Sequence, residues 1–278
     1  MSIYYAGLLA DIGILTLGAL SVYIILATDQ LSLGNAGFMA IGSYISSFLT
    51  VELHWPLTAA LIVAAATASV VGIVVGFPAL RLKGIYLAIA TLGFGEMVRS
   101  FFLVFRPMGG AGGFRGMQHV PLGYIWAWVA AILVMVTMLE QSRLWLQMRA
   151  IHDDETAAGL VGLNTTLIKV GGFGLGAAVA AVAGALFAHQ YVYIEPGNFG
   201  FERSIDFVLA VILGGSTVGV GGLAGAALLV LLPEWLRFVA EWRLAAFGAL
   251  LILVLLTRRQ GILDRPLLAK LTFRSAAS

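Results

Sequence analysis

The stretch Arg149-Ala-Ile-His-Asp-Asp-Glu-Thr-Ala-Ala-Gly-Leu-Val-Gly-Leu-Asn164 is a polar interruption between long hydrophobic runs. Because those runs are long enough to cross a membrane, this stretch is expected to lie in water between two spans. It also has the pattern of a short helix over residues 153–162. Asp153 is the expected N-cap, Asp154 and Glu155 place negative charge in the first turn, and Gly162 is the expected stop.

The same stretch presents small apolar residues. Ala157 and Ala158 are followed by Leu160 and Val161, which predicts a smooth apolar face on a water-exposed helix. Such a face indicates a docking surface for another protein. An ordinary solvated connector fits the composition equally well, and both interpretations stay open at this point.

The composition defines the broad class. Hydrophobic residues make up 60% of the 278 positions and charged residues 11%, against roughly 25% charged in soluble domains. Mean hydropathy is +0.99. These values predict an all-α polytopic membrane protein with a single domain over residues 1–278, surrounded by lipid. The net charge of +2 is interpreted as a topology signal, and nucleic acid is not an expected partner.

The hydrophobic runs predict about nine crossings, with eight or ten also compatible and some helices short or broken. The expected segments are Tyr5–Ala27, Ala36–Val51, Pro56–Phe77, Gly84–Phe105, Tyr124–Leu139, Leu167–Ala188, Ile205–Leu213, Gly222–Val239 and Leu244–Thr257. Pro78 is expected to close the third of them. The segment Ile205–Leu213 is too short to cross alone, which favours a discontinuous helix there.

Orientation is predicted from the basic residues. If residues 149–164 are cytoplasmic, ten of the 16 basic residues fall on the cytoplasmic side, and the N-terminus lies outside with the C-terminus inside. The ten are Arg81, Lys83, Arg143, Arg149, Lys169, Arg258, Arg259, Arg265, Lys270 and Arg274.

The sequence does not favour an enzyme. A phosphate-binding G-x-x-x-x-G-K-[ST] loop is missing, because none of the three lysines is followed by Ser or Thr. The four histidines, His54, His119, His152 and His189, are dispersed and show no metal-ligand spacing, and there is no cysteine. No catalytic residue, metal or cofactor is therefore expected on this chain.

Two kinds of polar feature are candidates for a solute pathway. Thr28–Asn35 breaks the apolar pattern with Gln30, Ser32 and Asn35 as hydrogen-bonding groups and Gly34 as a flexible point. Broken helices of this kind hold polar solutes in transporters, and a plain interfacial loop is the alternative. The glycine runs 109–113 and 214–222 are open to two interpretations, tight packing or unwound backbone along a pathway.

Charges inside predicted spans are rarer. Glu96 and Arg99 share one helix face and either pair structurally or face a substrate or gate. Arg203 and Asp206 have the same spacing, and interfacial capping is the expected explanation.

Several of these segments carry a family resemblance. The most specific is Leu80-Arg-Leu-Lys-Gly-Ile-Tyr-Leu-Ala-Ile-Ala-Thr-Leu-Gly-Phe-Gly-Glu96. Others are Gln30-Leu-Ser-Leu-Gly-Asn-Ala-Gly-Phe38, Met108-Gly-Gly-Ala-Gly-Gly-Phe114, Leu232-Pro-Glu-Trp-Leu-Arg237 and Arg258-Arg-Gln-Gly261. From about Gln30 to Leu263, the chain resembles the LivM-type membrane permease subunit of branched-chain amino acid ABC importers.

The resemblance implies an importer of the bacterial or archaeal cytoplasmic membrane. The expected partners are a homologous LivH-type permease, two LivG/LivF-type ATPase subunits that bind ATP and Mg, and a solute-binding protein. The implied ATPase-coupling residues are Arg149, Asp153, Asp154, Glu155, Ala157, Ala158, Gly162 and Asn164. The expected pathway residues are Gln30, Ser32, Gly34, Asn35, Thr91, Glu96, Arg99, Gly109, Gly110 and Gly113.

The chain departs from the family pattern at three positions, where Asn35 replaces a His, Met108 a Thr and Arg259 a Pro. Two of these lie in candidate pathway segments, so urea, short amides and aromatic acids are alternatives to branched-chain amino acids. An ion-coupled secondary transporter and a non-transporting scaffold are the competing functional classes.

Overall fold

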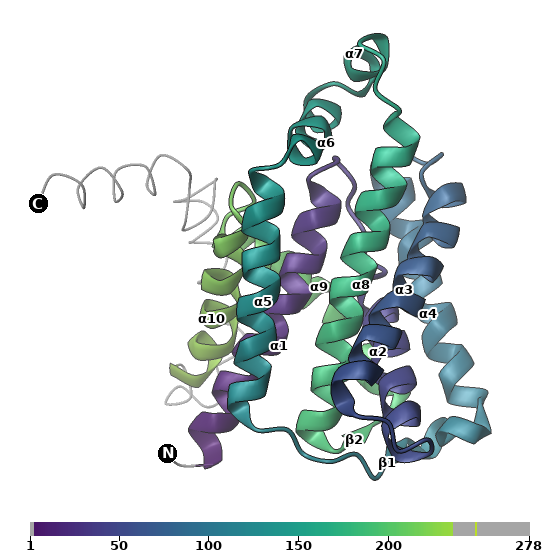
Figure 1. Ribbon diagram of the computed structural model, residues 1–278, viewed down its shortest axis with the longest axis vertical. Helices are drawn as coiled ribbons and strands as arrows, with labels where there is room; N and C mark the ends of the chain where they lie inside the picture. The colour runs from purple at the N-terminus through teal and green to yellow at the C-terminus, as the bar shows by residue number, and fades with distance from the viewer. Residues whose placement is uncertain (1–2, 236–247, 249–278) are drawn as a thin grey trace, which may run out of the picture.

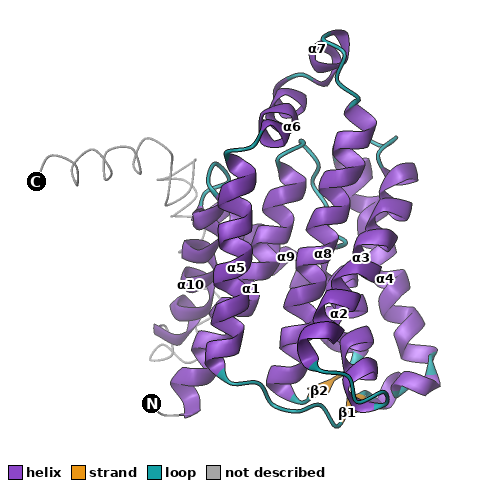
Figure 2. Ribbon diagram, viewed as in Figure 1, coloured by secondary structure: helices purple, strands orange, loops and turns teal. Residues whose placement is uncertain are grey.

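The computed structural model describes residues 3–235 and 248, and within them almost all regular structure is helical (Figures 1 and 2). The helices are α1 (Ile3–Leu26), α2 (Asn35–Val51), α3 (Leu57–Ala79), α4 (Ile85–Val104), α5 (Leu122–Glu140), α6 (Arg143–Asp153), α7 (Glu155–Leu160), α8 (Thr165–Tyr191), α9 (Phe201–Gly214) and α10 (Gly219–Trp235). Short 3₁₀ turns occupy η1 (Arg106–Met108), η2 (Gly110–Gly112) and η3 (Pro196–Phe199). Strands β1 (Phe114–Arg115) and β2 (Tyr193–Ile194) pair antiparallel, with Phe114 opposite Ile194.

Within the described residues, five helices are long and apolar enough to cross a membrane: α1, α3, α4, α5 and α8. A sixth span results if α9 and α10 are counted as one bent helix. Helix α2 has 17 residues, which is slightly too short for it to count as a candidate span. The expected segment 244–257 and the end of 222–239 lie outside the described residues. The helical membrane architecture is therefore confirmed, while the total of about nine crossings and the orientation stay predictions.

Helices α1 and α8 form the centre of the bundle. In their most apolar windows 83% and 78% of residues are buried, against 22–39% in α3, α4 and α5. Helix α8 packs against α1, α2 and α3. Its small residues allow this closeness: a Cβ added at Gly184 would lie 2.0 Å from the Met39 carbonyl oxygen of α2. The outer helices keep apolar side chains on the surface, as lipid-facing helices do.

The late apolar segments are discontinuous, as the short run 205–213 predicted. The helix direction bends by 115° between α9 and α10. The glycine run at this elbow serves close packing, because a Cβ at Gly214 would lie 1.8 Å from the Gly221 carbonyl oxygen. Of the two interpretations of this run, the structure favours tight packing.

The two ends of the bundle differ. Helices α6 and α7 project beyond one end, and the small β1–β2 ladder closes the other end (Figure 1). Pro78 does not close α3 from outside; it lies in the last turn, and the helix ends at Ala79.

Candidate functional site: the projecting hairpin and the buried polar break

Helix α6 precedes the predicted short helix and was not expected from the sequence. The Ser142 hydroxyl caps it by accepting a hydrogen bond from the Trp145 N–H at 3.3 Å. Trp145, Met148 and Ile151 are buried on one face. Their spacing of three, after a capping serine, is a signal that could have identified this helix. Residues 143–160 together form the α6–α7 hairpin.

Helix α7 begins one residue later than expected. Asp154, not Asp153, is the N-cap, and its Oδ1 accepts hydrogen bonds from the N–H groups of Thr156 and Ala157 at 2.8 and 3.0 Å. Asp153 is instead the last residue of α6 and is exposed. Asp154 has the extended backbone (φ −157°, ψ 106°) that an N-cap needs, because the chain turns there between two helices.

The predicted stop at Gly162 is confirmed. Its φ is +89°, a left-handed conformation that suits glycine. The Leu163 N–H donates to the Ala158 carbonyl at 3.2 Å, and the Gly162 N–H donates to the Gly159 carbonyl at 3.0 Å. This pair of bonds is the Schellman arrangement of a helix C-terminus. The ends of α7 are thus satisfied by residues next to it in the sequence.

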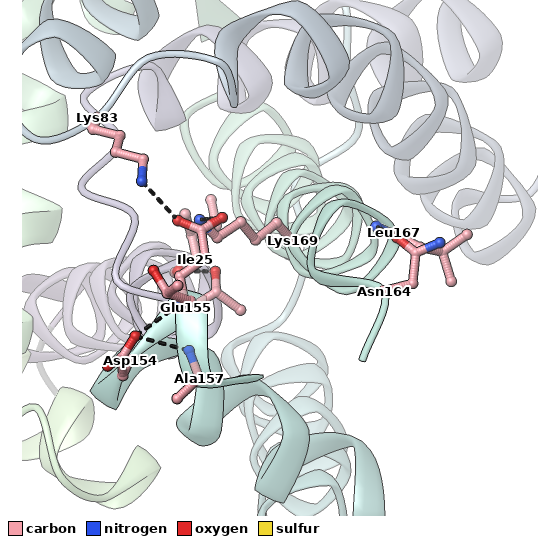
Figure 3. A network of polar contacts seen from close by, with 10 residues as sticks. Ile25, Lys83, Asp154, Glu155, Ala157, Asn164, Leu167 and Lys169 are labelled. Carbon is pink, nitrogen blue, oxygen red and sulfur yellow. Dashed lines mark hydrogen bonds and ion pairs between the residues drawn. The ribbon is translucent and has the colours of Figure 1, made fainter. Parts of the chain in front are cut away.

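Glu155 fixes the position of α7 against the bundle (Figure 3). Its carboxylate pairs with Lys169 of α8 at 2.7 Å and with Lys83 of the α3–α4 loop at 3.3 Å. The Lys169 hydrogen bond, with a further contribution from Lys83, lowers the pKa of the Glu155 carboxyl below its ordinary 4.5. The expectation that Lys83, Lys169 and residues 149–164 share one end of the molecule is confirmed.

The exposed face of α7 differs from the expected one. Ala158 is only 5% exposed and packs inward, whereas Leu160 and Val161 are 86% and 84% exposed. Ala157 is exposed. The prediction that both alanines belong to one docking face is therefore wrong for Ala158. Because α7 is only six residues long, its orientation depends on what lies beneath it, which the sequence pattern did not show.

The base of the α6–α7 hairpin contacts two other helices. The rings of Trp145 and Tyr23 of α1 lie 5.2 Å apart. Glu140, at the end of α5, accepts hydrogen bonds from the Tyr23 hydroxyl at 2.5 Å and from the Gly219 N–H at 2.7 Å. Gly219 is the first residue of α10. The hairpin thus contacts α1 through Trp145, and the end of α5 next to it is joined to α1 and to the elbow between α9 and α10.

The two remaining expected coupling residues lie at the edges of the hairpin. Arg149 is exposed on α6 and, with Thr217, lines a small cavity of about 140 Å³ beside Tyr23. Asn164 caps α8, because its Oδ1 accepts a hydrogen bond from the Leu167 N–H at 3.0 Å (Figure 3). Their positions favour structural support of the hairpin.

The polar side chains of the break between α1 and α2 are buried, while Asp29 and Leu31 are exposed. Gln30, Ser32 and Asn35 are at most 3% exposed. The Leu33 N–H donates to Thr91 Oγ1 of α4 at 3.0 Å. Irregular backbone at this depth needs such partners, because lipid and a dry core supply none.

Two serines that sequence reasoning missed complete the polar break. Asn35 Nδ2 donates to Ser21 Oγ of α1 at 2.8 Å, and the Ala36 N–H donates to Ser204 Oγ of α9 at 3.1 Å. Nothing in the local sequence marks Ser21 or Ser204, because their partners are distant in the chain. Gln30 Oε1 and Asn35 Oδ1 are buried and accept no hydrogen bond from the described residues. Two hydrogen-bond acceptors of the polar break are therefore left unpaired within the described residues.

Gly34 allows the polar break to lie against α4. A Cβ at Gly34 would lie 2.7 Å from the Thr91 carbonyl oxygen and 3.3 Å from the Phe94 ring. The structure thus places Thr91 against Leu33 and Gly34 of the polar break.

Glu96 and Arg99 lie on the same side of α4 and pair at 2.6 Å, with about 40% of each side chain exposed. The pair lines a cavity of about 600 Å³, and Arg203 and Asp206 of α9 line the same cavity. The two charge pairs, noted separately in the sequence, therefore face one space. Interfacial capping was the expected role of Arg203 and Asp206, and their place in the cavity lining was not expected.

The glycines that follow α4 are not part of the polar break. Gly109, Gly110 and Gly113 follow the end of α4, about 20 Å along its axis from Thr91. Gly109 and Gly113 have positive φ, and a Cβ at Gly113 would lie 2.6 Å from the Ile194 carbonyl oxygen of β2. The structure thus places these glycines in a tight loop against β2, away from the polar break.

Three histidines that are distant in sequence come together at the β1–β2 end. His54, His119 and His189 line a cavity of about 670 Å³. His189 Nε2 lies 3.0 Å from Thr50 Oγ1, and its Nδ1 lies 2.8 Å from the Ala185 carbonyl oxygen. In the described part of the chain, no group of three or more potential ligands is arranged to hold a metal ion.

Comparison with known proteins gives the family. The family model for "Branched-chain amino acid transport system / permease component" matches residues 4–255. The permease protein LivM of Escherichia coli K12 is 32% identical over 91% of this chain and 69% of its own length. LivM of Salmonella typhimurium is 32% identical over 84% of this chain and 63% of its own length.

LivH of Escherichia coli K12 is 35% identical over 50% of this chain and 46% of its own length. The chain thus spans about two thirds of the length of the LivM proteins and about half that of LivH. No solved structure matches it significantly. With its apolar helical bundle, the chain therefore belongs to the family of permease components of branched-chain amino acid transport systems, whose members are multi-pass membrane transport subunits and not enzymes.

Proposed function

We propose that the chain forms half of the translocation pathway of an ATP-driven importer and that the α6–α7 hairpin docks on a cytoplasmic ATPase subunit. The observation that carries the proposal is the pair Leu160 and Val161, 86% and 84% exposed at the tip of a capped helix. Two adjacent apolar side chains that project into water mark a contact surface. The ion pairs of Glu155 with Lys83 and Lys169 favour a single orientation of this surface relative to the bundle.

The contacts at the hairpin base support transmission of movement. A displacement of α7 reaches α6 through their short connection and then α1 through Trp145 and Tyr23. Glu140 joins the same region to the start of α10. Packed side chains and hydrogen bonds of this kind carry coupling between distant sites. Helix α1 in turn leads directly into the polar break at Gln30–Asn35.

The proposed assembly contains a second, LivH-type permease, two LivG/LivF-type ATPase subunits that bind ATP and Mg, and a solute-binding protein. The similarity to both LivM and LivH supports pairing with a homologous subunit. The half-exposed charges of Glu96 and Arg99 support a pathway beside α4, because charged groups at membrane depth face protein or water and not lipid. The N-terminus lies outside and the hairpin inside, in a bacterial or archaeal inner membrane.

The proposed cargo is a branched-chain amino acid, as the family description states for its members. Alternating access would move it past the polar break, whose buried amide oxygens of Gln30 and Asn35 accept no hydrogen bond from the described residues. Unpaired acceptors of that kind can accept a hydrogen bond from a passing ammonium group.

The test is Leu160→Asp, measured by co-purification of the ATPase subunits with the tagged chain and by leucine uptake into proteoliposomes. A charge in the docking surface is expected to lower both by at least tenfold. Leu53→Asp is the matched control, because Leu53 is 51% exposed at the opposite end of the bundle. It is expected to keep the ATPases bound. Retention of the ATPases by Leu160→Asp, or uptake by the purified chain alone on an ion gradient, would overturn the proposal.

A further inference from the structure

The cavity between α4 and α9 collects charges of both signs. Its lining includes Glu96 and Arg99 of α4, and Glu202, Arg203 and Asp206 of α9. Three acidic and two basic groups thus surround about 600 Å³, within the range of small-molecule sites. Asn198 of η3 adds an uncharged amide.

The depth of this cavity makes the charges informative. Glu96 is the twelfth residue of the 20-residue helix α4, so it lies about 16 Å from the start of the helix and about 12 Å from its end. Charged side chains near the middle of a membrane span are costly, and they persist where they face a partner or a solute. Substrate sites of transporters lie at this depth, beside broken helices.

The arrangement of the charges favours a neutral molecule with two opposite charges. Glu96 and Arg99 pair with each other, and about 40% of each side chain stays exposed, which leaves each able to bind a second group of opposite charge. The Arg203 guanidinium lies 5.1 Å from the centre of the Phe187 ring, which helps to hold it on its side of the cavity. An α-ammonium group is matched by the carboxylates of Asp206 and Glu96, and an α-carboxylate by Arg99 and Arg203.

The wall beside the charges is apolar. A second, narrow space shares Glu96 and Phe201 with the cavity and is lined by Leu33, Leu92 and Phe199. Phe201 is 43% exposed. Leu33 belongs to the polar break, so this second space lies between the cavity and the break.

We propose that the cavity between α4 and α9 is a binding site for the zwitterionic head group of α-amino acids, with Glu96, Arg99, Arg203 and Asp206 holding its two charges. The inference rests on the proposed function as a transport pathway and adds the place and chemistry of recognition within it. A ligand that lacks either charge makes fewer charge-assisted hydrogen bonds to these side chains, which is the expected source of discrimination.

The experiment measures equilibrium binding of radiolabelled L-leucine to the complex that purifies with the tagged chain, in nanodiscs and without any binding protein. Saturable binding is expected. Competition by 4-methylpentanoate, which lacks the ammonium, and by 3-methylbutylamine, which lacks the carboxylate, is expected to be at least tenfold weaker than competition by unlabelled leucine.

The variants Asp206→Asn and Arg99→Gln are each expected to weaken leucine binding by tenfold or more, while Asp206→Glu retains part of it. Glu52→Gln is the matched control, because Glu52 is an exposed carboxylate at the end of α2, outside the cavity. It is expected to bind leucine like the unmodified chain. Monodisperse elution and the bound ATPases check that each variant is folded.

Three results would overturn the site. They are absence of leucine binding to the unmodified complex, equal binding by the two cavity variants, and loss of the second permease from Arg99→Gln, which would make the charges a subunit interface. A complex that keeps its ATPases and binds no leucine removes the site and leaves the proposed function standing. A chain that purifies without ATPases contradicts the proposed function instead.

Discussion

The α6–α7 hairpin and the polar break between α1 and α2 are held in place in opposite ways. The ends of α7 are capped by Asp154 and by the turn at Gly162, which are its neighbours in the chain. The polar break is held by Thr91 and Ser204, which are 58 and 168 residues from the groups they bind. The ends of α7 are therefore determined by neighbouring residues, whereas the polar break depends on the assembled bundle.

The largest effect is expected from Gly34→Val, which disrupts the packing of the polar break. The added side chain would approach the Thr91 carbonyl oxygen, at 2.7 Å from Cβ, and this backbone atom cannot move without shifting α4. We expect loss of the folded protein, measured as disappearance of the monodisperse peak in detergent. Gly93→Val is the control, since nothing lies within 4 Å of a Cβ at Gly93. Equal yields of the two variants would contradict the tight packing of the break.

The two alanines of α7 sharpen the comparison within the hairpin. Ala158→Asp places a charge at a position only 5% exposed, which is expected to cost several kcal/mol and to detach α7 from the bundle. Ala157→Asp leaves α7 in place, because Ala157 is exposed. Limited proteolysis checks this: cleavage within residues 143–160 is expected for Ala158→Asp only. Equal protection of both variants would show that Ala158 is not buried.

Thr91→Val tests one hydrogen bond of the polar break. The Leu33 N–H would lose its acceptor, at a cost of about 1–3 kcal/mol for a buried donor left unpaired. We expect a lower midpoint temperature of thermal unfolding, measured by tryptophan fluorescence. The matched control is Thr137→Val, because the Thr137 hydroxyl bonds only within α5, to the Val134 carbonyl. A control shift as large as that of Thr91→Val would attribute the effect to the helix and not to the break.

The smallest effect is expected from titration of Glu155. Because its two lysine partners lower its pKa in the folded protein, the ion pairs contribute fully above the ordinary value of 4.5 and are lost as pH falls through the folded pKa. With a third of the side chain exposed, we expect no more than about 1 kcal/mol. Protease protection of the hairpin is expected to be constant above pH 5 and to fall below 4.5.

Glu155→Gln is the control for that titration and should remove the pH dependence. Among the lysines, Lys169→Met should weaken protection more than Lys83→Met, since the side chain of Lys169 is 11% exposed and that of Lys83 81%. A reversed order would show that the α3–α4 loop, and not α8, positions α7.

Sequence reasoning succeeded where the signal is local or periodic. The spans around α1, α3, α4, α5 and α8, the elbow after residue 213 and the stop of α7 at Gly162 all follow from apolar runs and glycine positions. It was wrong by one residue at the Asp154 cap because α6 was overlooked. It also assigned Ala158 to the exposed face, since a six-residue helix has too few turns for its pattern to define a direction.

The sequence by itself determined that this chain is a helical membrane protein with one polar stretch that carries a short helix, because hydrophobic run length and local capping are properties of neighbouring residues. It also marked Glu96, Arg99, Arg203 and Asp206 as unusual charges. Only the tertiary structure decided that the two pairs share one cavity, that Thr91, Ser21 and Ser204 hold the polar break, and that Glu155 lies between two lysines. Those facts depend on helix packing, where small residues in α8 and α2 set which distant side chains meet.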